Sequence, residues 1–242
     1  MQVTDMSKKD NLGDFLTDIA DAIREKKGTT EAINAQNFSE EIRSIESGGG
    51  EAIYDFGEAM TDTSGLGARA IKHLVVADGV TAIGNYAYNN FYLTSVTLPS
   101  SIKSIGNGSF NANNGYTELI IPDGVESIGV QAFYANQAKE IRLPASLKTL
   151  GNSAFESCQI NTGVRVPPSL MAIPNNAWAY ARKIKWFWFG DHTSVPTLGN
   201  IAAVNYSIGP IYVPDSLYDA WIAATNWSGV ASKIAKASTF TE

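Results

Sequence analysis

The residue types that most often perform chemistry are scarce in this chain and stand apart from one another. The two histidines, His73 and His192, have no acidic residue or cysteine at the spacing of a metal site, so we interpret both as structural or solvated. The single cysteine, Cys158, has no nearby histidine and is predicted to be a small buried apolar group rather than a nucleophile. The sequence therefore predicts no catalytic residue and no metal site.

Two glycine-containing patterns also give no binding site. Gly65-Leu66-Gly67 lacks the third glycine and the flanking strand and helix of a phosphate-binding loop. The pairs Asp78-Gly79 and Asp123-Gly124 each place one carboxylate at a turn, where Asp-Gly is expected on conformational grounds alone. We therefore expect no cofactor.

Composition narrows the function classes further. The chain has 242 residues, of which 44% are hydrophobic and 17% charged, so it can build a core and is not disordered throughout. Its formal charge of -6 would repel a phosphate backbone, which argues against a nucleic-acid partner. No apolar run is long enough to span a bilayer, so we expect no membrane insertion. Residues 1–14 lack the pattern of a secretory signal peptide.

Much of the chain consists of an internal repeat, and its strands and turns would position any surface site. Five segments share the template Pro-x-x-apolar-x-x-Ile/Leu-Gly-x-x-small-aromatic, with small departures in the first and last segments. The spacing between equivalent positions is 22, 23, 22 and 23 residues, which indicates a repeat architecture. The aromatic position is occupied by Tyr88, Phe110, Phe133, Phe155 and Trp178.

Each repeat contains a short alternating strand just before the proline position. The five strands are predicted at 74–76, 96–98, 119–121, 141–143 and 164–166. Alternation places the first and third residue of each triplet inward and the middle residue outward. A single coil has nothing to bury its inner face against, so neighbouring coils must stack. The prediction is an α+β solenoid with one parallel strand ladder, in which the repeated aromatic caps the interior of each coil.

At these residues the sequence resembles the BspA-like leucine-rich repeat of bacterial proteins, over about residues 71–190. The stretch Ile211-Tyr212-Val213-Pro214-Asp215, followed by Trp221 and Trp227, is similar to the helical cap that ends many such arrays. The resemblance implies surface or adhesion proteins that bind host macromolecules, with no catalytic residue in the repeats.

Four regions are predicted along the chain. Residues 1–47 form a helical N-terminal anchoring segment, 48–56 a Gly-rich linker, 57–190 the repeats, and 191–242 a degenerate repeat and the C-terminal cap. In the first region Phe15, Ile19 and Ile23 share one helical face that is too small to fold alone. We expect that face to dock on a partner or on another copy of the chain, which would give a homo-oligomer. Residues 12–46 also resemble a short helical segment of phage and prophage tail proteins.

The outward residues of stacked strands form continuous rows, because neighbouring strands lie about 4.8 Å apart. At the C-terminal end these rows bring together the candidate ligand-binding residues Arg142, Arg165, Trp186, Trp188 and Tyr212. Aromatic faces beside guanidinium groups suit sugar rings, acidic glycans or protein hot spots. In the alternative interpretation, the two tryptophans pack beneath the irregular coil at 190–210.

These observations predict a non-enzymatic recognition or adhesion protein of a phage or prophage tail, located on the virion. Its partners would be a host-surface protein or glycan and other subunits of the assembly. The alternatives are an adhesin at the bacterial cell surface and a purely structural module. An enzyme would need a nucleophile–base or carboxylate pair, which the repeat does not single out.

Overall fold

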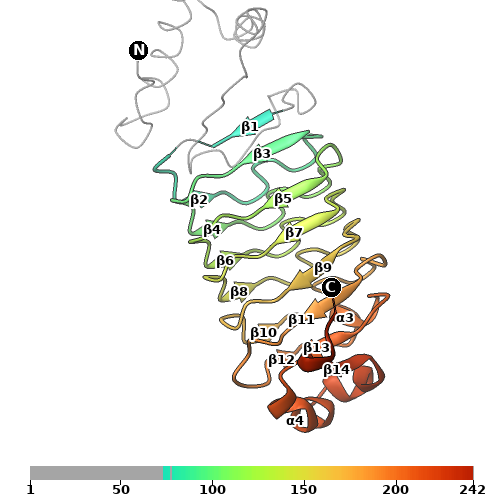
Figure 1. The fold of residues 1–242 in the computed structure, drawn as a ribbon. Helices are drawn as coiled ribbons and strands as arrows, with labels where there is room; N and C mark the ends of the chain where they lie inside the picture. Colours follow the sequence, from blue (N-terminus) through green and yellow to red (C-terminus); the bar gives the residue numbers. More distant parts are fainter. Residues whose placement is uncertain (1–72, 77, 242) are drawn as a thin grey trace, which may run out of the picture.

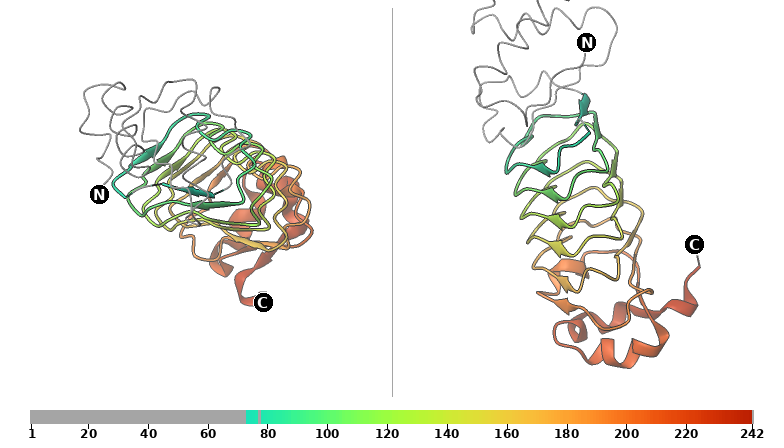
Figure 2. Two further views of the ribbon diagram at one scale, coloured as in Figure 1. Left: turned by 90° about the horizontal axis from the view of Figure 1, so that it is seen from above. Right: turned by 90° about the vertical axis from the view of Figure 1, so that its left-hand side faces the viewer.

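The computed structural model describes residues 73–76 and 78–241 of the chain. They form a solenoid in which successive coils stack along one axis (Figure 1). The view from above in Figure 2 shows the coils nearly superimposed along that axis. The fold predicted from the repeat, a solenoid of stacked coils with parallel strands and a helical C-terminal cap, is confirmed. The N-terminal segment, the linker and the residues Phe15, Ile19 and Ile23 lie outside the described residues.

Two series of parallel strands run along the solenoid. The first ladder consists of three-residue strands: β1 (His73–Val75), β3 (Ser95–Thr97), β5 (Glu118–Ile120), β7 (Glu140–Arg142), β9 (Gly163–Arg165), β11 (Trp186–Trp188), β13 (Ile211–Val213) and β14 (Ile234–Lys236). The second ladder consists of two-residue strands: β2 (Ala82–Ile83), β4 (Ser104–Ile105), β6 (Ser127–Ile128), β8 (Thr149–Leu150), β10 (Ala172–Ile173) and β12 (Thr197–Leu198).

The first ladder carries the alternation that the sequence predicts. Leu119, Ile141 and Val164 are buried, whereas Ile120, Arg142 and Arg165 are exposed. Each strand begins one residue earlier than predicted, because the first residue of each observed strand also pairs with its neighbour, as Glu118 does with Glu140. Inward and outward faces are unaffected, so the prediction of the outer rows is correct.

The expectation of a single ladder is wrong, because the Ile/Leu-Gly step of each repeat also forms a strand. In this second ladder Ile83 pairs with Ile105, Ile105 with Ile128, and Ile128 with Leu150. A two-residue strand is too short to show a period-2 pattern, so the sequence does not indicate it.

The repeated aromatics form one column through the core. The rings of Tyr88, Phe110, Phe133 and Phe155 stack with centroid separations of 5.3–5.4 Å, and Trp178 continues the column 5.9 Å from Phe155. All five side chains are buried. Burial of large rings in parallel stacks makes this column a main source of hydrophobic stabilisation between coils.

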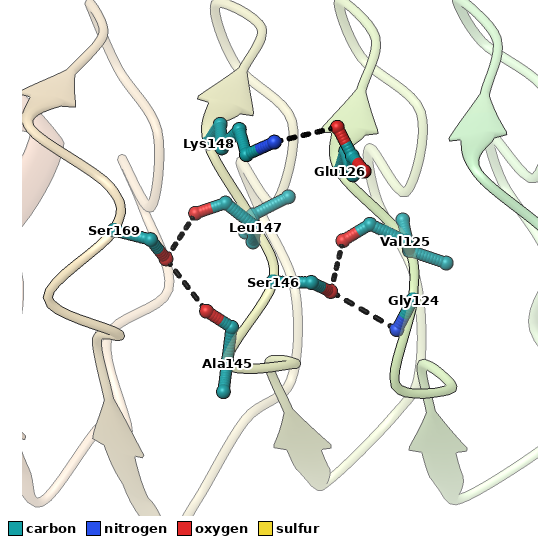
Figure 3. A network of polar contacts seen from close by, with 8 residues as sticks. All are labelled: Gly124, Val125, Glu126, Ala145, Ser146, Leu147, Lys148 and Ser169. Atoms are coloured by element: carbon teal, nitrogen blue, oxygen red, sulfur yellow. Dashed lines mark hydrogen bonds and ion pairs between the residues drawn. The ribbon is translucent and has the colours of Figure 1, made fainter.

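Polar side chains join the coils at the turns. The Ser146 hydroxyl accepts a hydrogen bond from the Gly124 amide at 3.0 Å and donates one to the Val125 carbonyl at 2.7 Å (Figure 3). Ser101 makes equivalent bonds to Gly79 and Val80. These hydroxyls satisfy backbone groups that the turns leave without a ladder partner.

After β11 the repeat becomes irregular but keeps both ladders. β12 follows, and the helix α3 (Ala202–Asn205) replaces the aromatic-capped turn before β13. The cap then runs through η3 (Asp215–Leu217), α4 (Tyr218–Ala223) and η4 (Trp227–Lys233) to β14 and η5 (Ala237–Thr239). Trp221 and Trp227 are buried against Phe189, so the cap closes the open end of the core.

Candidate binding site on the first ladder

The outward face of the first ladder is aromatic at its C-terminal end. β11 pairs in parallel with β9 and β13, so Arg165, Trp188 and Tyr212 lie side by side in one row. Trp186 lies two residues before Trp188, opposite Gly163 of β9. We call Arg165, Trp186, Trp188 and Tyr212 the aromatic platform.

Two glycines allow the indoles to lie against the backbone. A methyl group at Gly163 would come within 2.0 Å of the Trp186 ring, and one at Gly190 within 2.3 Å of the Trp188 ring. A side chain at either position would force the indole to move, because carbon atoms do not approach one another this closely. A glycine inside a strand often marks such a close approach.

The Arg165 guanidinium contacts both tryptophans of the platform. Its carbon lies 5.5 Å from the centre of the Trp186 ring and 5.3 Å from that of Trp188, within the range of cation–π contacts. The Trp188 indole N–H donates a hydrogen bond of 2.9 Å to the Asp191 carboxylate. The hydrogen bond orients the Trp188 indole, and Arg165 contacts both indoles.

Arg142, the fifth predicted residue, makes a different contact. Its guanidinium bonds to Glu140 at 3.1 Å on the same strand, where Arg142 is exposed and Glu140 is partly exposed. Arg142 lies at the edge of the platform, on β7, the strand before β9 in the stack (Figure 1). An exposed ion pair of this kind is worth little in stability.

One side chain outside the repeat, Phe240, lies on the platform and is not predicted by the sequence pattern. The Phe240 ring centroid lies 4.9 Å from those of Trp186 and Tyr212 and 5.0 Å from that of Trp188. Phe240 follows η5 and lies outside the repeat, so no periodicity points to it. The available signal was a lone aromatic within the polar run Ser238-Thr239-Phe240-Thr241.

The two tryptophans are only half-buried. Trp188 contacts the irregular coil at 190–210 through Gly190 and Asp191. The ring that packs against both indoles is that of Phe240, which lies outside this coil. The other three tryptophans are buried in the core. The platform is therefore a partly open surface with one side chain of the same chain on it.

Cys158 has a structural role that its position in the repeat explains. Its thiol donates a hydrogen bond of 3.0 Å to the Phe133 carbonyl, as the Asn113 amide does to the Tyr88 carbonyl at 2.7 Å. Both partners lie 25 positions earlier in the chain. Burial raises the pKa of the Cys158 thiol to about 12, which leaves it protonated and unreactive at neutral pH.

His192 is buried beside Phe189 and Trp221, and its Nδ1 lies 3.1 Å from the Phe189 carbonyl oxygen. Burial lowers the pKa of this imidazole, so its neutral form is favoured. His73 lies in β1. Within residues 73–76 and 78–241, no group of three or more His, Cys, Asp or Glu side chains could hold a metal ion. In the same part of the chain, every helix is too short or too polar to cross a bilayer.

Comparison with known proteins agrees with this geometry. The sequence profile of the BspA type leucine-rich repeat region matches residues 67–217 in six copies. No curated protein is significantly similar to the chain. Among solved structures, a leucine-rich repeat protein from Bacteroides ovatus superposes with a TM-score of 0.52 at 24% identity, over 62% of this chain. The pneumococcal vaccine antigen PcpA superposes with the same TM-score at 16% identity, over 68% of this chain.

The described solenoid is smaller than these relatives. This chain spans 45% of the Bacteroides ovatus protein and 40% of PcpA. At these identities the likeness concerns the fold, namely a stack of leucine-rich repeat coils with parallel strand ladders.

Proposed function

Because the chain belongs to the BspA-type leucine-rich repeat family, we propose that it is a non-enzymatic recognition protein that binds a host-surface protein or glycan through the aromatic platform. The observation that carries the proposal is the contact of Arg165 with Trp186 and Trp188, with Tyr212 next to Trp188, on an outward strand face. Rigid aromatic rings beside an arginine are the residues that concentrate binding energy at interfaces.

The geometry explains why this end of the ladder is favoured. Glycines at 163 and 190 leave room for the indoles close to the backbone, and the contacts with Arg165 and Asp191 restrain them, so little side-chain entropy remains to be lost when a partner covers them. The N-terminal end of the same face has Thr97, Glu118 and Ile120, which are exposed but make no such cluster.

The proposed location is the bacterial cell surface, since the family to which the repeat belongs is associated with surface and adhesion proteins. A phage or prophage tail is the second candidate, and it is based on the sequence of residues 12–46, which lie outside the described residues. Antibody labelling of intact cells and of induced phage particles from the native host would separate the two.

Binding itself can be tested with arrays. The full chain, fluorescently labelled, is applied to an array of glycans and to an array of host extracellular proteins. We expect Trp188→Ala and Trp186→Ala to weaken the strongest interaction by roughly 1 to 3 kcal/mol. Tyr86→Ala, at an exposed ring on a turn outside the platform, is the matched control and should bind like the wild type. Equal binding by all four proteins would refute the proposal.

A further inference from the structure

We propose that Phe240 is an internal ligand that masks the aromatic platform, and that the external partner displaces it with an aromatic side chain of its own. The proposal rests on the proposed function of the platform and names both the ligand chemistry and the device that controls access. It follows from how Phe240 contacts the platform, what holds the preceding residues, and what charge lies beside the ring.

Phe240 contacts every residue of the platform. Its ring meets Trp186 and Tyr212 at interplanar angles of 77° and Trp188 at 58°, so the rings meet edge to face or tilted. Edge-to-face pairs at these separations are favourable. The Arg165 guanidinium carbon lies 5.8 Å from the centre of the Phe240 ring. Three rings and one arginine thus form a partial cage around a single planar group.

The charge beside the ring narrows the ligand class. Aromatic cages commonly bind quaternary ammonium groups, but here a guanidinium lies against the cage and would repel a cation. The Asp191 carboxylate accepts the Trp188 N–H, so it orients that indole. The cage already accommodates a side chain with no polar atom. These features favour a neutral aromatic side chain over a cation, and over a sugar, whose hydroxyls need several hydrogen-bond partners.

The attachment of Phe240 is suited to release. Residues up to Lys236 are fixed by the pairing of β14 with β13 and by the burial of Ile234. Beyond them, Ser238 bonds to the Asp215 carboxylate through its amide at 3.0 Å and its hydroxyl at 2.6 Å, both on an exposed surface. Phe240 itself is only half-buried. Exposed hydrogen bonds contribute modestly to stability, so residues 237–240 can detach while the cap stays folded.

The test uses the full chain and its intrinsic fluorescence. Because Trp178, Trp221 and Trp227 are buried, acrylamide quenching reports mainly on Trp186 and Trp188. We expect Phe240→Ala to increase quenching and to leave the melting transition in place, whereas the matched variant Tyr86→Ala should leave quenching unchanged. A capped peptide Ala-Ser-Thr-Phe-Thr, with the sequence of residues 237–241, should protect the indoles of Phe240→Ala again. The same peptide with alanine in place of phenylalanine should not.

The wild type should bind the phenylalanine peptide more weakly than Phe240→Ala does. If the internal ring occupies the platform nine-tenths of the time, the difference is about tenfold, because only the open fraction is competent to bind. Unchanged quenching in Phe240→Ala would overturn the masking. Protection by a neutral or acidic oligosaccharide, but not by the peptide, would overturn the aromatic ligand class. Quenching of the wild type that falls with protein concentration would show that Phe240 comes from a second copy.

These outcomes are separate from a failure of the proposed function. The fluorescence assay concerns only how the chain's own residues and the peptide occupy the platform. A platform that binds no host molecule would appear as equal array binding by Trp188→Ala and wild type, whatever the peptide does.

Discussion

The rings of Phe110 and Phe133 lie parallel, with an interplanar angle of 2° and centroids 5.4 Å apart, although they belong to different coils. Phe155 stacks on the other side of Phe133 at 5.3 Å. Phe133 therefore connects three consecutive coils through their common core. In a solenoid each coil contacts only its neighbours, so such a column makes local packing continuous along the whole stack.

Phe133→Ala should lower the free energy of unfolding by about 3 to 5 kcal/mol, because it removes a fully buried ring between two others. Urea titration followed by far-UV circular dichroism measures the change. Val130→Ala in the same coil is the control, since Val130 is exposed, and it should cost little. A loss below about 1 kcal/mol for Phe133→Ala would contradict the stacked core.

Gly163→Ala should displace the Trp186 indole, because the added methyl group would lie 2.0 Å from the ring. We expect a cost of about 1 to 3 kcal/mol from overpacking and an increase in acrylamide quenching of tryptophan fluorescence. Gly79→Ala controls for adding a methyl group elsewhere, since no atom lies within 4 Å of the new carbon, although the positive φ of Gly79 adds its own strain. If only Gly79→Ala changed the quenching, the close contact between Gly163 and the Trp186 ring would be wrongly assigned.

The contact between Asp215 and Ser238 should respond to pH in one direction. The two hydrogen bonds from Ser238 lower the pKa of the Asp215 carboxyl below its usual value. Such a group stabilises the docked state above its unbound pKa, about 3.9, and this contribution is lost as pH falls through the lowered pKa. Docking of Phe240, measured by acrylamide quenching, should therefore be constant from about pH 5 to 8 and weaken only in acid.

Asp215→Ala is the variant that tests this linkage. It should give higher quenching at neutral pH and lose the acid-dependent change, while circular dichroism shows that the solenoid stays folded. A transition in the wild type near pH 6.5 would point to a histidine instead and would rule out Asp215 as the titrating group.

The next prediction concerns the N-terminal segment, which lies outside the described residues. Charged substitutions at Ile19 and Ile23 should abolish self-association, because they place charge on the only large apolar face of a predicted helix. Size-exclusion chromatography with light scattering, on the full chain and on a chain starting at Glu51, measures the mass. The melting transition of the solenoid should not move. An unchanged mass in the variants would refute the anchoring role.

The solenoid could be predicted because the same pattern of buried positions recurs in every repeat. Equivalent positions such as Phe110, Phe133 and Phe155 recur at 22–23 residues, and each recurrence is another observation of the same buried site. The outward row of Arg165, Trp188 and Tyr212 followed from strand alternation, which is correct even though the strand bounds were displaced by one residue. The second ladder was not predicted, because a two-residue strand is too short to show an alternating pattern.

Phe240 could not be predicted for a different reason. Its contacts with Trp186 and Trp188 join residues more than 50 positions apart, across a cap that has no repeat. Nothing in the local sequence specifies where a short polar segment folds back. Gly163 indicates a close approach to the backbone, because it is a glycine within an outward strand row, but the group that approaches it is Trp186 and not Phe240.

The central claim is that the aromatic platform binds the external partner and that Phe240 competes for it. The most direct measurement is the affinity of Trp188→Ala and of Phe240→Ala for the same array-identified partner, side by side with the wild type. The account predicts opposite effects: weaker binding for Trp188→Ala by roughly 1 to 3 kcal/mol and stronger binding for Phe240→Ala. Weaker binding by both variants, or no change in either, would contradict it.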